Sequence, residues 1–251
     1  MDNLLKIQNC NKHFNGIIAL DDFSCEISKN EIVGLIGPNG AGKSTLFNVI
    51  TGFISIDSGQ ITFNNHTITK KAPNKINKFG ISRTFQGLRL IRQMTVLDNI
   101  LLSFKKQPGE HLENVFFKNK KAKEIESENK RKALKLLKDT GIEDKANDLA
   151  DDLSYGQQKL LSLLCCLASD AELLLLDEPI AGINPAMIEK ILFIITELPK
   201  KGKSVILIEH NMDAVSQVCE RVIFMDTGKK ISEGTPEEVR NDPKVIEAYL
   251  E

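Results

Sequence analysis

The sequence predicts an α/β protein with a mostly parallel sheet, a small antiparallel β portion and a helical insert. Three apolar runs, at residues 32–36, 173–176 and 204–208, have the length and composition of fully buried parallel strands. Helical patterns separate these runs along the chain, as expected for a sheet covered by helices. The 251 residues are enough for a substantial core.

The same patterns predict how this one domain is organised. We expect the core to combine residues 1–86 with residues 166–251. A helical subdomain is inserted between about residues 87 and 165, where helical patterns dominate.

Composition excludes several classes of protein. The chain has 41% apolar residues, 27% charged residues and a formal net charge of −1, without the basic excess typical of nucleic-acid binding. No apolar run approaches the roughly 20 residues of a membrane span, and the N-terminus lacks a signal-peptide pattern. The five scattered cysteines fit a reduced interior: Cys10, Cys25, Cys165, Cys166 and Cys219. We expect a cytosolic protein that can dock on a membrane partner.

Residues 4–29 alternate in the manner of short strands, with a turn at Asn15-Gly16. Phe14 stands alone in a polar stretch just before that turn. Its ring can stack on a purine or fill the edge of a small sheet, and the residues alone favour neither role.

A glycine-rich loop follows the strand at 32–36 and precedes a helix that ends near Thr51-Gly52. Backbone N–H groups of such a loop, with the helix N-terminus, bind phosphate. Lys43 can reach the β- and γ-phosphates and the Ser44 hydroxyl can coordinate Mg²⁺. A chance glycine-rich turn is the alternative, but the strand and helix on either side favour a nucleotide. The predicted loop is Gly37, Pro38, Asn39, Gly40, Ala41, Gly42, Lys43, Ser44 and Thr45.

The middle of the chain begins with strands and then becomes helical. We expect strands at 58–63 and 81–86, a loop with a short helix at 64–79, and a capped amphipathic helix within 88–103. Residues 105–132 hold nine Lys or Arg against five acids. A solvated helical excursion is favoured there over a basic surface near lipid headgroups.

Two further helices precede the second buried strand. Ala133 to Leu137 suit a helix that ends near Gly141, and a helix from Leu153 to Leu167 opens with Ser154 and Gln157 in a capping-box pattern. The N-terminus of this second helix attracts an anion, although the pattern taken alone favours a simple helix cap.

The strand at 173–176 ends in Asp177-Glu178, which is a second pattern with chemical meaning. Asp177 is placed to hold Mg²⁺, often through water, and Glu178 to orient the attacking water. An Asp-Glu pair after a strand is also a common turn, but the phosphate loop upstream favours catalysis.

The C-terminal part predicts a helix at 186–198 and the strand at 204–208, which stops at Glu209-His210. A hairpin follows, with its turn at Asp226-Thr227-Gly228. Residues 236–251 form two short helices separated at Pro243.

These motifs resemble those of ABC-transporter ATP-binding subunits, in identity and in order. The phosphate loop comes first, then Leu153-Ser154-Tyr155-Gly156-Gln157, then the strand with Asp177-Glu178, and finally His210. The resemblance covers essentially the whole chain. It implies a P-loop NTPase (RecA-like) core, ATP and Mg²⁺ as cofactors, and an ATPase that works as a homodimer or heterodimer on membrane permease subunits, without nucleic acid.

The resemblance also implies roles for individual positions. Phe14 matches the aromatic that stacks on adenine, and Gln86 the glutamine that senses nucleotide and Mg²⁺ and lines the groove for the membrane subunit. Ser154, Gly156 and Gln157 match the signature that binds the γ-phosphate of the other protomer.

Two more positions gain their roles from the family. Residues 181–184 match the loop that couples the two sites, and His210 matches the histidine that contacts the γ-phosphate. For His210 alone, a satisfied core histidine would be favoured; the strand-end position and the resemblance reverse that preference. The metal would be held by Ser44, Gln86 and Asp177 through ATP and water.

The chain departs from the usual family pattern at Tyr155, where glycine is usual, and at Asn184, where aspartate is usual. Both look like the subfamily for branched-chain amino acid uptake, as do residues 83–86, 94–99, 105–132 and 234–251. The expected function is therefore ATP-driven import on the cytoplasmic face of the membrane. Alternatives are urea import, lipopolysaccharide export, a soluble ABC ATPase of translation or DNA repair, and a regulatory nucleotide-binding module without turnover.

Overall fold

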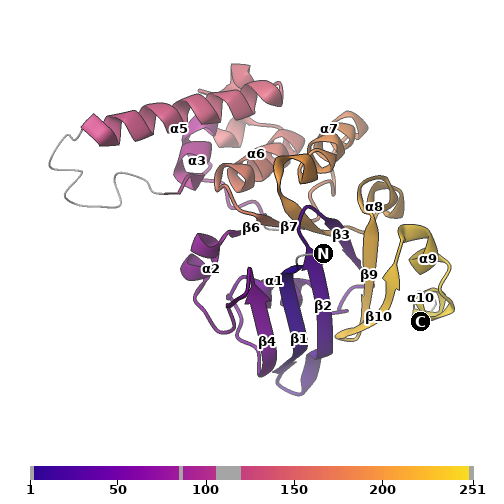
Figure 1. The fold of residues 1–251 in the computed structure, drawn as a ribbon. Coiled ribbons are helices and arrows are strands. Elements are labelled where there is room, and N and C mark those ends of the chain that lie inside the picture. The colour runs from indigo at the N-terminus through magenta and orange to yellow at the C-terminus, as the bar shows by residue number, and fades with distance from the viewer. Residues whose placement is uncertain (1–2, 85–86, 106–119, 249–251) are drawn as a thin grey trace. The chain divides into compact units, whose positions relative to one another are not determined.

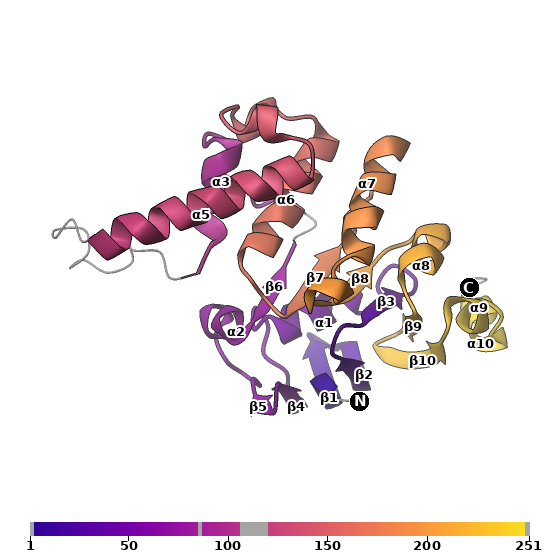
Figure 2. The same ribbon diagram turned by 45° about the horizontal axis from the view of Figure 1, so that its top comes forward.

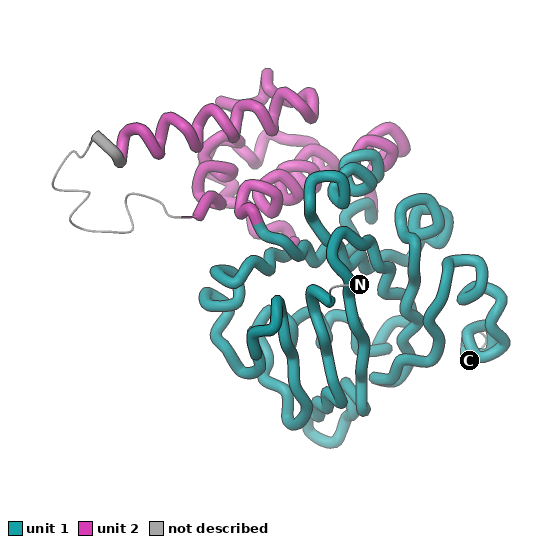
Figure 3. The backbone as a smooth tube through the Cα atoms, in the orientation of Figure 1, with its two compact units in different colours: residues 1–83, 171–181, 191–251 teal, residues 84–170, 182–190 magenta. Residues whose placement is uncertain are grey.

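The computed structural model describes residues 3–84, 87–105 and 120–248. The chain forms two compact units (Figure 3). The first, here called the core unit, comprises Met1–Arg83, Ala171–Ala181 and Ile191–Glu251. The second, here called the helical unit, comprises Thr84–Asp170 and Gly182–Lys190.

The larger sheet of the core unit has six strands, of which five are parallel (Figure 1). In spatial order they are β10 (Lys229–Gly234), β9 (Arg221–Asp226), β3 (Ile32–Ile36), β8 (Ser204–Ile208), β7 (Leu173–Asp177) and β6 (Ile81–Arg83). The three apolar runs of the sequence are β3, β7 and β8, and every residue of these strands is buried. The predicted α/β class with a mostly parallel sheet is confirmed.

The smaller sheet is antiparallel and has the order β2-β1-β4-β5. Its strands are β1 (Asn3–Phe14), β2 (Ile17–Ser28), β4 (Ser58–Phe63) and β5 (His66–Thr67). The prediction of several short strands over 4–29 is wrong, because β1 and β2 have 12 residues each and meet at the predicted turn. Register shifts interrupt the alternation without ending the strands, and Asn9 has a φ of +47° at one of them.

Helix α1 (Lys43–Ile50) belongs to an apolar cluster that also includes residues of both sheets. Phe47 of α1, Phe23 of β2 and Phe63 of β4 are completely buried in it, and each such ring contributes roughly 1.5–3 kcal/mol of burial free energy. The helix that follows the phosphate loop is therefore held firmly by its apolar face.

The remaining helices of the core unit are short (Figure 2). They are α2 (Pro73–Phe79), α8 (Met212–Val218), α9 (Pro236–Arg240), α10 (Pro243–Ala248) and the 3₁₀ turn Pro199–Lys201. α7 (Pro185–Thr196) begins in the helical unit and ends in the core unit. The predicted hairpin between β9 and β10 is present, and Thr227 and Gly228 at its tip both have positive φ.

The helical unit is built on α3 (Val96–Ser103), α5 (Lys120–Asp139) and α6 (Tyr155–Ala168), with short 3₁₀ turns at Glu143–Lys145 and Ala150–Asp152. α3 packs on α5 and α6 through buried residues such as Ile100, Leu137 and Leu164. The Thr95 hydroxyl caps α3 by accepting the Asp98 N–H at 3.0 Å, as the sequence predicts for this helix.

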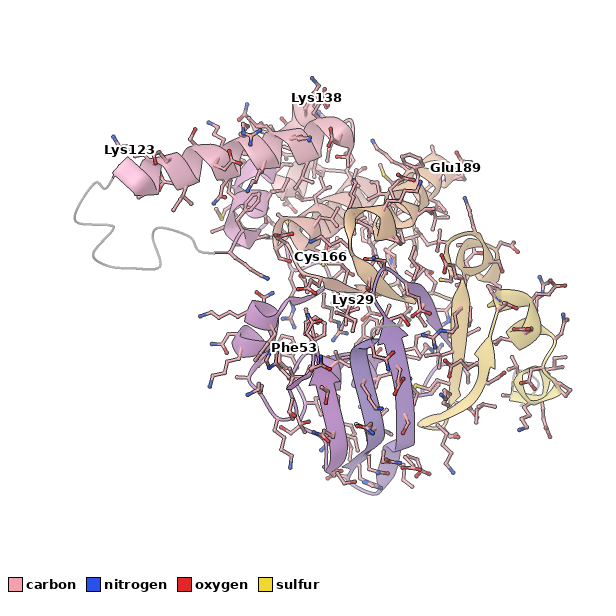
Figure 4. The ribbon with its side chains drawn as sticks, viewed as in Figure 1. Lys29, Phe53, Lys123, Lys138, Cys166 and Glu189 are labelled. Atoms are coloured by element: carbon pink, nitrogen blue, oxygen red, sulfur yellow. The ribbon has the colours of Figure 1, made fainter. Side chains whose placement is uncertain are left out.

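α5 covers the described part of the predicted basic segment. It is a 20-residue helix, longer than the pattern at 133–141 indicates, and residues 106–119 of the segment lie outside the described residues. Lys123 and Lys138, near its two ends, have exposed side chains (Figure 4). Within the described ranges, no helix has both the length and the apolar content needed to cross a bilayer.

Candidate nucleotide site

The phosphate loop leaves β3 and enters α1 with three glycines at positive φ. A Cβ on Gly37 would lie 1.9 Å from the Met225 carbonyl oxygen, and one on Gly42 would lie 2.3 Å from the Ala19 carbonyl oxygen. The Gly228 N–H donates to the Ala41 carbonyl at 3.0 Å and ties the loop to the β9–β10 turn. Only glycine fits this backbone path at 37 and 42.

The loop ends at the N-terminus of α1, where Gly42 is the N-cap. The first N–H groups of a helix have no acceptor within the helix, so the loop presents them as donors. This cap makes no side-chain hydrogen bond in the structure described, and the first turn of α1 carries no acid. Ser44 is exposed in that turn. The N–H groups and the positive end of the helix dipole suit a phosphate group.

Lys43 is buried, and its ammonium folds back onto the loop. Its Nζ donates to the carbonyl oxygens of Gly37 at 2.7 Å and Pro38 at 2.8 Å. Burial lowers the pKa of Lys43, and the nearby charges of Glu178 and Asp177 oppose that shift. Lys43 therefore lies within the electrostatic influence of both carboxylates.

Asp177 ends β7 in a buried ion pair with Arg83, which ends β6. One guanidinium nitrogen of Arg83 donates to Asp177 Oδ2 at 2.7 Å and another donates to Asn48 Oδ1 at 2.7 Å. The guanidinium carbon also lies 5.2 Å from the centre of the Phe47 ring. Arg83 thus joins the ends of two strands to α1, the helix of the phosphate loop.

Glu178 follows Asp177 and has a φ of +49°, which is uncommon for a residue other than glycine. Its N–H donates to the Ile208 carbonyl at 2.9 Å, and its Oε1 lies 3.1 Å from Nε2 of His210. β7 and β8 are parallel neighbours (Figure 2), so Glu178 and His210 meet at the carboxyl ends of adjacent strands. An unusual backbone conformation held by its surroundings is typical of functional sites.

Phe14 lies at the end of β1 with 40% of its surface exposed. Lys12 Nζ is 5.1 Å from the centre of its ring and 2.8 Å from Asp57 Oδ1. The His13 N–H donates to the other Asp57 oxygen at 2.7 Å. These contacts fix the strand that carries the ring, and its stacking on adenine stays a prediction.

The remaining predicted positions are Gln86 and the residues at the start of α6. Gln86 falls outside the described residues. Ser154, Gly156 and Gln157 lie in the helical unit at the start of α6, where the predicted capping box is formed. The Ser154 N–H donates to Gln157 Oε1 at 2.9 Å, and the Gln157 N–H donates to Ser154 Oγ at 3.4 Å.

The two departures from the family pattern have local contacts within the helical unit. A Cβ on Gly182 would lie 3.4 Å from the Tyr155 ring, so this ring packs closely against the 181–184 loop. Asn184 Oδ1 accepts the Met187 N–H at 3.0 Å, a helix-capping contact that aspartate makes equally well.

Arg83 and Glu209 are functional candidates that the sequence did not single out. Glu209 is only 3% exposed, and its Oε1 accepts the Ile180 N–H at 3.0 Å. For both residues, the sequence offered one indication of a functional role: a charged side chain at the end of a strand. Their partners depend on which strands are neighbours, and the sequence does not give that order.

A glycine-rich loop between a buried parallel strand and a helix, in a sheet where another buried strand ends in Asp177, defines a P-loop nucleotide-binding protein. Comparison with known families makes this assignment more specific. Residues 20–181 match the model described as ABC transporter. The chain belongs to this family, and the predicted P-loop ATPase class is confirmed.

Curated relatives match along nearly the whole chain. The high-affinity branched-chain amino acid transport ATP-binding protein LivG of Salmonella typhimurium is 38% identical over 248 residues, which cover 98% of this chain and 97% of the relative. A probable LivG of Methanocaldococcus jannaschii is 39% identical over 253 residues, with the same coverage. In addition, residues 229–250 match the model described as branched-chain amino acid ATP-binding cassette transporter.

Solved structures agree with these matches. A nucleotide-free ATP-binding cassette from an ABC transporter is 37% identical, with a TM-score of 0.85 and full coverage of both chains. A cassette in its ADP conformation is 36% identical, with a TM-score of 0.85, and covers 100% of this chain and 99% of its own. A dimeric cassette bound to ADP and Pi is 26% identical, with a TM-score of 0.76, covering 92% of this chain and 98% of its own.

Proposed function

We propose that this chain is the ATP-hydrolysing subunit of a branched-chain amino acid importer. It would lie on the cytoplasmic face of the membrane against permease subunits, paired with a second ATP-binding subunit. The matches to LivG proteins and the match of residues 229–250 support this cargo. The observation that carries the catalytic part is the Glu178–His210 pair beside Asp177 and Lys43.

Lys43 can bind phosphate in addition to its present partners. Its ammonium has three N–H groups, of which the Gly37 and Pro38 carbonyls accept two, so the third would reach a phosphate oxygen. The N–H groups of the loop and of the α1 N-terminus would hold the β-phosphate. The exposed ring of Phe14 would stack on the adenine.

The residues at the site fit Mg²⁺. Asp177 and Ser44 offer a carboxylate and a hydroxyl, which are the oxygen ligands this ion takes. A Cβ at Gly40 would meet no atom within 4 Å, so the loop is open at this position. When bound, Mg²⁺ supplies neutralisation of phosphate charge. Arg83 donates a hydrogen bond to Asp177 Oδ2 and so would orient this carboxylate toward the ion.

Hydrolysis would use Glu178 to polarise a water molecule. The water oxygen attacks the γ-phosphorus, the bond to the bridging oxygen breaks, and ADP and inorganic phosphate are formed. His210, at 3.1 Å from Glu178, would hold this carboxylate and contact the γ-phosphate. Positioning and charge neutralisation dominate such reactions, so these few groups suffice.

The second ATP-binding subunit would complete each site. Ser154 and Gly156 at the N-terminus of α6 would face the γ-phosphate held by the opposite subunit, with Gln157 beside them. The related dimeric cassette bound to ADP and Pi supports a dimeric mode of action. Gln86 would line the groove for the permease, so that dimer closure on ATP and opening after hydrolysis are transmitted to it.

The test of the catalytic assignment is Glu178→Gln. The variant should bind MgATP within about threefold of the parent while its turnover falls by about 100-fold or more, since the polarising carboxylate is lost. Unchanged turnover with normal MgATP binding would refute the role of Glu178. Co-purification tests transport: a multi-spanning membrane partner supports it, whereas ribosomes or DNA would contradict it.

A further inference from the structure

Hydrogen bonds from backbone N–H groups hold the turn that carries Glu178. The Glu178 N–H donates to Ile208, and the Ala181 N–H donates back to the Glu178 carbonyl at 3.3 Å. Pro179 has no N–H to place. The remaining donor, the Ile180 N–H, goes to the carboxylate of Glu209. This contact comes from a side chain, whereas the two other contacts of the turn join backbone groups.

Glu209 stands between two other residues that hold the same turn. Ile208 accepts the Glu178 N–H through its carbonyl, Glu209 accepts the Ile180 N–H through its side chain, and His210 meets the Glu178 carboxylate. Three consecutive residues therefore hold the turn after β7, through two contacts to Glu178 and one to Ile180. The contact of Ile208 uses its backbone carbonyl and does not depend on its side chain. The contact of Glu209 with the Ile180 N–H depends on the Glu209 side chain.

We propose that Glu209 is a positioning residue, which holds the turn after β7 so that Glu178 keeps its positive-φ conformation and points to the phosphate site. The inference rests on the proposed catalytic role of Glu178. A buried N–H without an acceptor is unfavourable, so loss of the Glu209 carboxylate would drive the turn toward a conformation in which Ile180 finds another partner. A φ of +49° at Glu178 is the first feature that such a shift would relax.

The contacts argue for a positioning role rather than a catalytic one. Glu209 is 3% exposed and accepts a backbone N–H, whereas the Glu178 carboxylate is partly exposed and meets His210. The acceptor, rather than the negative charge, is what the Ile180 N–H requires. Glutamine retains that acceptor and methionine, of similar length, does not.

The test compares Glu209→Gln, Glu209→Met and Glu209→Asp in the full chain. Ser204→Ala is the matched control, because Ser204 lies at the other end of β8 and its Oγ accepts the Asn30 N–H at 2.8 Å, a contact of the same kind. The glutamine variant should keep turnover within about threefold of the parent, because the acceptor remains. Methionine should lower kcat by about tenfold or more while the Kd for MgATP changes less than about threefold.

Aspartate retains the charge but is one methylene shorter, so the kcat of Glu209→Asp should fall between those of the other two variants. If Glu209→Met does not fold, Glu209→Asp replaces it in the comparison. The control should keep the parental kcat even where its thermal stability falls. Equal kcat losses in the control and the methionine variant, or a glutamine variant as slow as methionine, would overturn the proposal.

A double variant separates this proposal from the function on which it rests. In the Glu178→Gln background, Glu209→Met should leave the residual turnover unchanged, because the residue it positions is already inactive. A further loss of the same size as in the parent would show that Glu209 acts elsewhere and refute the inference. Full turnover in Glu178→Gln alone would instead refute the catalytic role of Glu178.

Discussion

Replacing Arg83 with methionine should be among the most destabilising single changes at the site. The side chains of Arg83 and Asp177 are 7% and 4% exposed, so methionine would leave a buried carboxylate without the cation that now lies 2.7 Å from it. Breaking such a pair by removing one partner costs about 3–5 kcal/mol. That is a large fraction of the roughly 5–15 kcal/mol by which a domain is stable.

Arg131→Met provides the matched control for this prediction. Arg131 and Glu128 on α5 also lie 2.7 Å apart, but their side chains are 71% and 43% exposed. The same substitution at the same distance should therefore leave the unfolding midpoint unchanged, because water screens the exposed pair. Burial is the main difference between the two ion pairs, and Arg83 also contacts Asn48 and Phe47.

Equilibrium urea unfolding followed by circular dichroism measures both effects, since the chain has no tryptophan to report by fluorescence. The unfolding midpoint of Arg83→Lys should lie between those of the parent and Arg83→Met. Lysine keeps the charge, but it lacks the planar guanidinium that donates to Asp177 and Asn48 at the same time. If Arg83→Met lowered the midpoint no more than Arg131→Met, the buried pair would not stabilise the site as argued.

Two other predictions concern the loop and the N-terminal sheet. Gly37→Ala should abolish measurable nucleotide binding in a fluorescent-nucleotide titration, since its Cβ would lie 1.9 Å from the Met225 carbonyl. Gly40→Ala, strained by its φ of +86° but without a clash, should weaken binding less, and equal losses would contradict the steric argument. Hydrogen bonds from Lys12, and from the backbone after it, lower the pKa of Asp57 to about 2. This carboxylate's contribution to stability is present above pH 3.8 and is lost as the pH falls toward about 2; carboxyl NMR should show the low midpoint, and Lys12→Met should raise it.

Fold prediction from sequence worked where one physical signal dominated. A fully buried parallel strand must be apolar at every position, so β3, β7 and β8 could be placed by composition alone. β1 and β2 could not, because their register shifts break the period of two that marks a half-buried strand. The polar residues at these shifts resemble turns in the sequence, although the strands continue through them.

Prediction of the site had a similar limit. The phosphate loop and Asp177-Glu178 could be recognised because each is a motif of consecutive residues. Arg83 and Glu209 act on residues about 30 to 90 positions away in the chain, across the strand order β6-β7-β8. Local sequence carries the identity of a reactive group, whereas the groups that orient it come from neighbouring strands and need the topology.

The charged groups of the site already have partners within the chain, and this has a consequence for nucleotide binding. Lys43 is held by two backbone carbonyls, Asp177 by Arg83, and Glu178 by His210. An ammonium has three N–H donors, so Lys43 can add a phosphate oxygen to its two carbonyl partners. In the proposed mechanism, contacts that need not break hold the Asp177 and Glu178 carboxylates in place, and such preorganisation would favour the transition state over the bound ground state.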